Sequence, residues 1–312
     1  MKTAFAFLLF ACLAPAAINY SYDSAGRLIK VDYGNGSVII YNYDNNGNLT
    51  GRSVQTSSGG ATPVISGVTT AFAPAAVGIA QNTWIVVKGS NLVPPATPAA
   101  GVIWSSAPSF ASGQMPTQLG GISVTVNGKP AFIYFFCSAA TSPVCTSDQI
   151  NALTPLDSTL GSVSAVVNNN GISSAPITVN MNPIAPSFLL FDSAGHIVAT
   201  HLSGSLLGPA NLYPGASTPA KPGEVIVAYA VGFGLPTAAI VNGSASQSGT
   251  LGSVPVCQIG GTAAPVAASL ISPGLYQLNL TIPSGAASGD NPISCVYGGS
   301  TTPSGDLITV QQ

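Results

Sequence analysis

The sequence has very little charge. Lys, Arg, Asp and Glu make up 5% of its 312 residues, and Glu224 is the only glutamate. Helices usually place Lys and Glu on the face that meets water, so this shortage argues against a helical protein. A net charge of -2 gives no electrostatic basis for binding nucleic acid or an anionic membrane. The hydrophobic content of 46% excludes a disordered chain.

Side chains that perform catalysis or hold metal ions are also scarce. His196 and His201 are the only two histidines, and their spacing along a predicted strand puts them on opposite faces without a third zinc ligand. A Ser-His-Asp triad can be drawn on paper from either histidine with Asp192, but turn and strand positions explain these residues without catalysis. Most of the nine acidic residues lie beside Gly, Ser or Asn in predicted turns, so no pair for glycoside cleavage is evident. We predict no catalytic residue, no cofactor and no metal, and therefore no enzyme.

Long hydrophobic runs are missing after the N-terminus. No later stretch reaches the ~18 apolar residues that span a membrane, so no transmembrane segment is predicted. At the N-terminus, Lys2 precedes an apolar segment over 4–13 and small residues over 14–17. This pattern is typical of a secretory signal peptide, which we assign to residues 1–17; a buried N-terminal strand is the alternative. The chain is expected to be secreted or displayed on the cell surface.

Cysteine usage fits export. Cys12 follows a segment similar to a lipoprotein box, although the bulky Phe10 fits that box poorly, so lipidation stays open. The four later cysteines form no CxxC motif and lie far from both histidines, which argues against zinc. In an oxidising compartment the simplest disulfide connectivity joins neighbours along the chain: Cys137 with Cys145, and Cys257 with Cys295. The alternative is that these cysteines are free buried thiols.

One short pattern occurs twice at an offset of 128 residues. The matching positions are Gln149 and Gln277, Asn151 and Asn279, Pro155 and Pro283, Gly161 and Gly289, and Gly171 and Gly299. This ungapped set predicts two copies of one β-module. On a strand the Gln and the Asn of each copy share a face, where they either hold a crossing loop or present amides to a sugar.

Residues 18–60 form a different unit. The stretch from Tyr22 to Leu28 reads YDSAGRL and recurs from Tyr43 to Leu49 as YDNNGNL. It resembles the YD repeats of RHS-type secreted bacterial proteins, and strand-turn-strand patterning predicts a four-strand meander followed by a linker. A calcium loop is one interpretation of the alternating side chains Asp44, Asn46 and Asn48, but Leu49 stands where such a loop needs a glycine. We therefore favour the interpretation that these side chains stabilise a turn.

Residues 61–182 read as short strands with frequent turns. The clearest signal is the hairpin over 121–131, where an alternating strand meets Asn127-Gly128. The opening segment PVISG at 63–67 and the strand IVVKGSNL at 85–92 resemble those of IPT/TIG modules, which are immunoglobulin-like domains. The resemblance departs at a long Pro- and Ser-rich insertion over 93–118.

Residues 183–312 read as a second, related sandwich. Its ending PGLYQLN at 273–279, with VGFG at 231–234, resembles the C-terminal domain of a large paralogous family of exported soil-bacterial proteins with no established activity. The predicted fold class is therefore all-β: two tandem immunoglobulin-like β-sandwiches preceded by a short YD-repeat meander.

Two functions stay open. The first is a structural or adhesive protein that acts by surface contact with the cell envelope, a matrix or another protein. The second is a carbohydrate-binding accessory module. A secreted hydrolase is favoured less than either. The expected partner is therefore a protein or polysaccharide surface, and not nucleic acid. Trp84 is expected in the core, and for Trp104 packing between domains is favoured over a surface contact. The candidate contact aromatics are Trp104, Tyr213 and Phe233.

Overall fold

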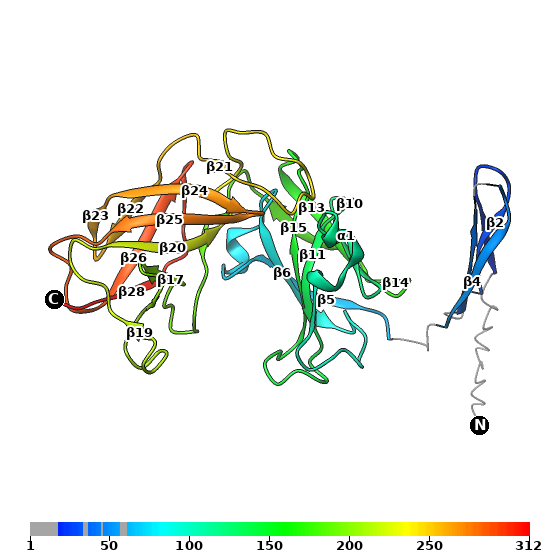
Figure 1. The fold of residues 1–312 in the computed structure, drawn as a ribbon, viewed down its shortest axis with the longest axis horizontal. Coiled ribbons are helices and arrows are strands. Elements are labelled where there is room, and N and C mark those ends of the chain that lie inside the picture. Colours follow the sequence, from blue (N-terminus) through cyan, green and yellow to red (C-terminus); the bar gives the residue numbers. More distant parts are fainter. Residues whose placement is uncertain (1–17, 34–36, 45, 57–60) are drawn as a thin grey trace, which may run out of the picture. The chain divides into compact units, whose positions relative to one another are not determined.

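A computed structural model describes residues 18–33, 37–44, 46–56 and 61–312 of the chain. The predicted signal peptide and Cys12 lie outside the described residues. The chain divides into two compact units, Met1–Ala61 and Thr62–Gln312. In these described ranges, strands account for nearly all regular structure (Figure 1), with three single-turn helices: η1 (Ala75–Val77), η2 (Trp104–Ser106) and α1 (Pro108–Ala111). The predicted all-β fold class is therefore confirmed.

The first unit is an antiparallel meander in the order β1-β2-β3-β4. The carboxylate of Asp23 accepts hydrogen bonds from the backbone N–H groups of Ala25 and Arg27, and Asp44 does the same for Asn46 and Asn48. Both aspartates therefore close turns, as Asx-type residues do. The strands are β1 (Asn19–Tyr22), β2 (Leu28–Asp32), β3 (Ser37–Tyr43) and β4 (Leu49–Thr56).

Two sheets form the first sandwich in the second unit. One runs β5-β6-β12-β11-β7, with β5 (Val64–Thr70), β6 (Trp84–Ser90), β7 (Val102–Ile103), β11 (Phe132–Cys137) and β12 (Asp148–Leu153). The other runs β10-β9-β13-β14 with β8 beside β9 and β15 beside β13: β8 (Gln118–Leu119), β9 (Ile122–Val126), β10 (Lys129–Pro130), β13 (Gly161–Asn169), β14 (Ile172–Ser173) and β15 (Ile177–Met181). The facing side chains Ile85, Val124 and Ile150 are fully buried between the sheets.

The second sandwich has the same plan. One sheet runs β19-β18-β17-β20-β25-β24-β21 with β16 beside β20: β16 (Ser187–Phe188), β17 (Ala199–His201), β18 (Leu206–Leu207), β19 (Ser217–Thr218), β20 (Val225–Val231), β21 (Gly249–Thr250), β24 (Val266–Ser272) and β25 (Leu275–Thr281). The other runs β23-β22-β26-β27 with β28 beside β26: β22 (Val256–Ile259), β23 (Thr262–Ala264), β26 (Gly289–Tyr297), β27 (Ser300–Thr301) and β28 (Leu307–Val310).

The duplicated motif occupies matching places in the two sandwiches. Strand β12 lies between β6 and β11, and β25 lies between β20 and β24. Gln149 Nε2 donates to Asn151 Oδ1 at 2.8 Å, and Gln277 Nε2 donates to Asn279 Oδ1 at 2.9 Å. The recurring pair therefore makes one bond along the outer face of each strand, while Ile150 between its members is buried in the core.

The predicted hairpin at Asn127-Gly128 is confirmed. Both residues have positive φ, 51° and 71°, as a two-residue hairpin turn requires. Asn127 also donates to the buried carboxylate of Asp157 at 2.8 Å, and Lys129 pairs with it at 3.0 Å. Hydrogen bonds from Asn127 and Thr159, with Lys129, hold the pKa of Asp157 well below its usual range. This charged anchor ties the hairpin to the loop before β13.

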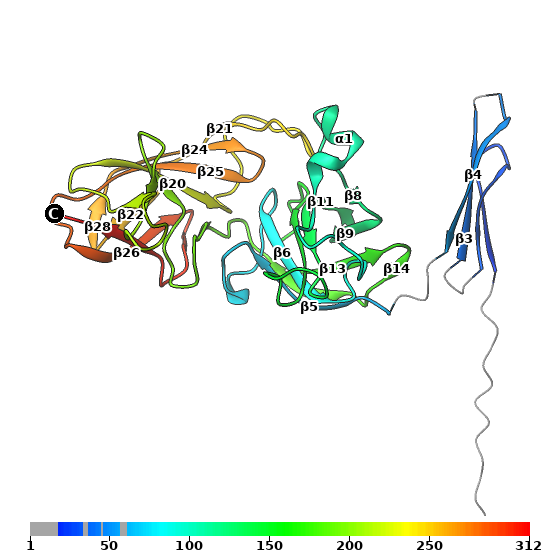
Figure 2. The ribbon, with the colours of Figure 1, turned by 60° about the horizontal axis from the view of Figure 1, so that its bottom comes forward.

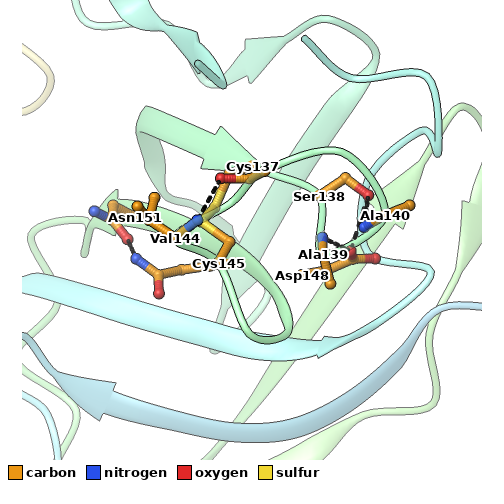
Figure 3. The surroundings of a disulfide bond; sticks show 10 residues. Cys137, Ser138, Ala139, Ala140, Val144, Cys145, Asp148 and Asn151 are labelled. Atoms are coloured by element: carbon orange, nitrogen blue, oxygen red, sulfur yellow. Dashed lines mark hydrogen bonds between the residues drawn. A yellow bond between two sulfur atoms is a disulfide. The ribbon is translucent and has the colours of Figure 1, made fainter. Parts of the chain in front are cut away.

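Both expected disulfides are present. Cys257 and Cys295 lie directly opposite each other on β22 and β26 and are buried. Cys137 and Cys145 close the loop between β11 and β12 (Figure 3). Beside that disulfide, Asp148 accepts hydrogen bonds from the N–H groups of Ala139 and Leu92. The β11-β12 connection is thus fixed at both ends.

Within residues 62–312 the two sandwiches are joined by specific contacts. In Figure 2 the yellow segment before β21 reaches the segment that follows α1, where Gln114 forms an antiparallel bridge with Ser244. The buried amide of Asn82 donates to Gln247 at 2.9 Å. Trp84 Nε1 donates to the carbonyl oxygen of Pro273 at 2.7 Å. The Trp84 bond holds β6 against the β24-β25 turn of the second sandwich, and the other two contacts involve the segment before β21.

Candidate ligand-binding pocket

A pocket of about 330 Å³ lies at this junction. The first sandwich contributes residues of β6, β11 and β12, the turn after β5 and η2. The second contributes Leu189, the end of β20 and the β24-β25 turn with the start of β25. Its lining is mainly apolar, with one amide and one serine hydroxyl: Ala71, Phe72, Trp84, Ile85, Trp104, Tyr134, Asn151, Leu189, Val231, Ser272, Pro273 and Leu275. The volume falls at the small end of the range of sites that hold small ligands.

Three aromatic rings form the centre of the wall from the first sandwich. The ring centroids of Trp84 and Trp104 are 5.7 Å apart, those of Trp84 and Tyr134 5.5 Å, and those of Trp104 and Tyr134 5.0 Å. All three pairs are edge-to-face, which is a favourable arrangement for aromatic rings. Phe110 of α1 packs on Trp104 at 4.9 Å. The cluster is therefore preorganised, with Trp84 further fixed by its bond to Pro273.

The insertion predicted over 93–118 builds one side of this site. It contains η2, which begins at Trp104, and α1, which carries Phe110. The residues that follow α1 cross to the second sandwich, where Met115 N–H donates to Gly243 O at 2.8 Å. The departure from the IPT/TIG pattern is thus the segment that supplies both a pocket tryptophan and a junction contact.

Phe72 stands at the pocket in an unusual backbone conformation. Its φ is 62° and its side chain is 50% exposed. A bulky residue in the left-handed region costs roughly 1–2 kcal/mol. Hydrogen bonds on both sides, Ala71 N to Trp84 O and Ala73 N to Thr70 O, hold the turn in place. The fold thus maintains an exposed phenyl ring beside the pocket against a local backbone preference.

Neither histidine lies in the pocket lining. His196 Nδ1 contacts Asp192 at 2.7 Å and Nε2 contacts Asp290 at 3.4 Å. Burial opposes a charge on His196, but the hydrogen bonds and charges of the two aspartates outweigh it and raise its pKa. Both ring nitrogens of His196 thus contact carboxylates. In a Ser-His-Asp triad with Asp192, a serine would have to contact Nε2, but Asp290 occupies that position. Asp192 also closes the turn before His196.

His201 is held in a separate place. Its Nδ1 bonds to Glu224 and its Nε2 contacts Thr218. Ser203 and Ser205, the nearby serines, hydrogen-bond to each other at 2.9 Å. Throughout the described ranges, no group of three His, Cys, Asp or Glu side chains is placed to hold a metal ion. In the same residues, none of the helices has the length and hydropathy that a membrane crossing needs.

The three aromatic residues predicted to make contacts lie in different environments in the structure. Trp104 lines the pocket. Tyr213 is 40% exposed but packs on Phe191 in the second sandwich, away from the pocket lining. The prediction for Phe233 is wrong: its side chain is fully buried and packs against Tyr276 and Tyr297. Trp84 is half-buried on the outer face of its sheet, where it packs against a small buried cluster of Met115, Phe132 and Leu153 and not in the main core between the sheets.

Beside the buried Phe233, Gly232 lets two backbone segments pack closely. Gly232 has a φ of 78°, and a Cβ there would lie 1.8 Å from the carbonyl oxygen of Ala185. Only glycine fits such an approach. The Gly-Phe-Gly segment is therefore a close crossing of two chain segments beside a buried ring.

Several pocket residues were not predicted as contact residues. Tyr134 falls within an apolar run that reads as a buried strand, and Phe72, Leu189 and Ser272 lie near strand ends without a distinguishing pattern. One feature of the sequence could have indicated a contact role for Tyr134, namely its hydroxyl group within a run of phenylalanine and isoleucine over 132–136. Asn151 was singled out with its repeat, and the structure places it in the pocket lining.

The buried carboxyl group of Asp306 should make the stability of the second sandwich depend on pH. Its side chain is 5% exposed, and its Oδ2 accepts no hydrogen bond from the described residues. Burial raises its pKa from 3.8 to about 7. Because the folded state binds this proton more tightly than the unfolded state, ionisation destabilises the fold as pH rises from about 4 through 7.

We therefore expect Asp306→Asn to stabilise the protein at pH 8.5, by up to about 4 kcal/mol, and to change little at pH 4. Urea unfolding of both proteins at the two pH values measures the difference. The same difference at both pH values would contradict a buried, ionising carboxyl at this position.

Comparisons with known proteins define the first unit more than the second. The sequence model of the RHS Repeat family matches residues 22–62, which confirms the predicted YD repeats. A search of curated proteins found no match. The resemblance of the sandwiches to IPT/TIG modules stays a prediction.

Several solved structures are similar at low identity. A Bacteroides ovatus SGBP-B from a mixed-linkage glucan utilization locus, in complex with a heptasaccharide, is 11% identical, with 95% of this chain and 64% of that chain covered and a TM-score of 0.34. An SGBP-B from a xyloglucan utilization locus of Bacteroides uniformis is 14% identical, with 79% and 49% covered and a TM-score of 0.22. Domains 5–6 of the S-layer protein SbsC are 10% identical, with 80% and 98% covered and a TM-score of 0.23.

The chain spans less than two thirds of the length of the first of these structures. All three TM-scores are low, so the likenesses carry no conclusion about what this chain binds. The candidate site therefore depends on the geometry of the pocket itself.

Proposed function

We propose that this chain is a non-catalytic contact protein that acts outside the cytoplasm and binds its partner at the pocket between the two sandwiches. The observation that carries the proposal is the lining of the pocket. It combines four aromatic rings with a single amide and a single serine hydroxyl, and it contains no carboxylate, imidazole or lysine. Ser272 thus has no base beside it in the lining, so the site is suited to binding and not to acid-base or nucleophilic chemistry.

Export is part of the proposal. Residues 1–17 serve as the signal peptide, and the two disulfides belong in an oxidising compartment. The low charge of the chain suits contact with neutral surfaces. The envelope of a cell, a matrix or another protein is the class of partner, and neither nucleic acid nor a cofactor takes part.

The domain boundaries follow the same proposal. Residues 18–60 form the repeat unit and its linker, 61–182 the first IPT/TIG-like sandwich and 183–312 the second. Strand β15 ends at Met181 and β16 begins at Ser187, so the second boundary falls between strands. Placing the pocket at this boundary makes the binding site a product of two domains.

The test is retention of oxidised protein, residues 18–312, on purified cell envelopes and on insoluble polysaccharides. We expect Ser272→Phe, which adds a ring inside the pocket, to lower retention at least tenfold. The control Ser294→Phe changes another half-buried serine of the second sandwich that is not in the pocket lining and should retain binding. Circular dichroism on both variants establishes that each is folded.

Three results would contradict the proposal, the third of them only its placement at the pocket. One is wild-type protein that is retained on none of the materials. Another is the steady release of soluble fragments from a material by the wild type, since this would show turnover. Equal retention of Ser272→Phe and Ser294→Phe would move the contact away from the pocket.

A further inference from the structure

The lining of the pocket selects for a ligand that is neutral, flat and amphipathic. Phe72, Trp84, Trp104 and Tyr134 present ring surface, while Asn151 supplies polar hydrogen-bonding groups. The absence of charged side chains among the lining residues leaves nothing to pair with an ionic ligand. A purely apolar ligand would leave the amide without a partner, which costs free energy. A pyranose ring satisfies both requirements, because its C–H face is apolar and its rim carries hydroxyls.

The amide in the pocket is held ready for such hydroxyls. Gln149 Nε2 donates to Asn151 Oδ1 at 2.8 Å, which fixes the orientation of the Asn151 amide. That bond occupies the oxygen of Asn151 and leaves its amide hydrogens and the oxygen of Gln149 as remaining groups. Both side chains are half-buried on the outer face of β12. Their spacing of two residues extends the polar strip by about 7 Å along the strand.

The strip leads away from the pocket along the sheet. Gln149 lies opposite Lys88 of β6, and Asn151 lies between Val86 of β6 and Phe135 of β11. A polymer with one unit in the pocket can therefore continue over this face, with polar and apolar groups side by side. The pocket alone would hold only a short ligand.

The second sandwich provides an internal comparison. It has the same bonded pair, Gln277 and Asn279, on the outer face of β25. Neither of those residues belongs to the pocket lining, whereas Asn151 does. The amide pair by itself is thus a feature of the module, and only its first copy contributes a residue to the aromatic pocket. Phe72, exposed at a conformational cost, adds one more ring at the same place.

We propose that the pocket binds a pyranose unit of a neutral polysaccharide, with the ring against the aromatic side chains and its hydroxyls bonded to Asn151, and that the polymer continues past Gln149. This rests on the proposed function, because it names the ligand of the same site. Trp84 and Trp104 are the only tryptophans of the chain, so tryptophan fluorescence reports on this pocket alone.

The experiment titrates oxidised 18–312 with soluble neutral polysaccharides, namely a β-glucan, a xylan and a galactomannan, and with polygalacturonate as the acidic comparison. We expect at least one neutral polymer to change tryptophan emission saturably, with polygalacturonate ineffective. Asn151→Ala should weaken that binding about tenfold through loss of its hydrogen bonds. The matched control Asn279→Ala removes the equivalent amide and should bind as the wild type does.

A second variant separates binding from folding. Phe72→Gly removes the ring and relieves the left-handed conformation, so its Tm should equal or exceed that of the wild type while its affinity falls about fivefold or more. Equal affinity of wild type, Asn151→Ala and Phe72→Gly would overturn the sugar assignment. So would tighter binding of polygalacturonate than of every neutral polymer.

The outcomes also separate the two proposals. Envelope retention that depends on Ser272, with no response to any neutral polysaccharide, would overturn the sugar assignment and leave the contact function standing. Loss of all retention on envelopes and polysaccharides alike would overturn both.

Discussion

Replacing Gly274 by alanine should separate the two sandwiches and abolish the pocket. Gly274 has a φ of 64°, and a Cβ there would lie 2.4 Å from Leu153 Cδ1 and 3.1 Å from both Asn82 O and Trp84 Cδ1. The substitution therefore adds a steric clash across the junction to the usual left-handed penalty. We expect a loss of roughly 3–5 kcal/mol in the free energy of unfolding and a red shift of tryptophan emission as both indoles meet water.

The control is Gly261→Ala in the same sandwich. Gly261 has a φ of 78°, but a Cβ there would meet nothing within 4 Å. It should therefore lose only the roughly 1–2 kcal/mol of left-handed strain and keep native tryptophan emission. Urea unfolding followed by both fluorescence and circular dichroism measures the two effects. Identical behaviour of the two variants would show that Gly274 is not tightly enclosed.

Removing the Cys257–Cys295 disulfide should destabilise the second sandwich more than removing Cys137–Cys145 destabilises the first. The loops that the two bonds close differ in sequence separation, 38 against 8. Loop-closure entropy alone gives about 4 kcal/mol for the longer and about 2.5 kcal/mol for the shorter. The longer loop also includes β23, β24 and β25, whose last member brings Leu275 to the pocket.

Paired Cys→Ala variants at each disulfide, unfolded in urea without reductant, measure this order. Alanine avoids burying a new hydroxyl at Cys257 and Cys295, both of which are in the core. A larger loss for the Cys137–Cys145 pair would contradict loop entropy as the controlling term. It would indicate instead that the β11-β12 connection is the weak point of the first sandwich.

The modules themselves could be predicted because their signals are local. Asn127-Gly128 predicts a two-residue hairpin from backbone preference alone, and alternation over 122–126 fixes which side chains face the core. The offset of 128 residues predicts equivalent strands, and β13 and β26 indeed begin at Gly161 and Gly289. Cysteine pairing followed from proximity along the chain and from the modular division.

The pocket could not be predicted because its parts come from separate segments. Phe72, Trp104 and Tyr134 come together only when the strands of the first sandwich pair, and Leu275 reaches the pocket only when the two sandwiches dock. No pattern in the sequence encodes that docking. The prediction of Phe233 as a contact residue was wrong for a related reason. A glycine at positive φ is typical of an exposed turn, but it also permits a close crossing of buried segments, and only the fold distinguishes the two.

The most direct test of the account is the pair of indole N–H signals in a ¹⁵N–¹H spectrum of the oxidised protein, titrated with neutral glucan, xylan and mannan oligosaccharides. The chain has two tryptophans, both in the pocket lining, so two signals report on the site. We predict that at least one oligosaccharide shifts both signals saturably, and that Ser272→Phe abolishes the shift. Indole signals that stay unmoved at every concentration of every oligosaccharide would contradict a sugar site at the junction.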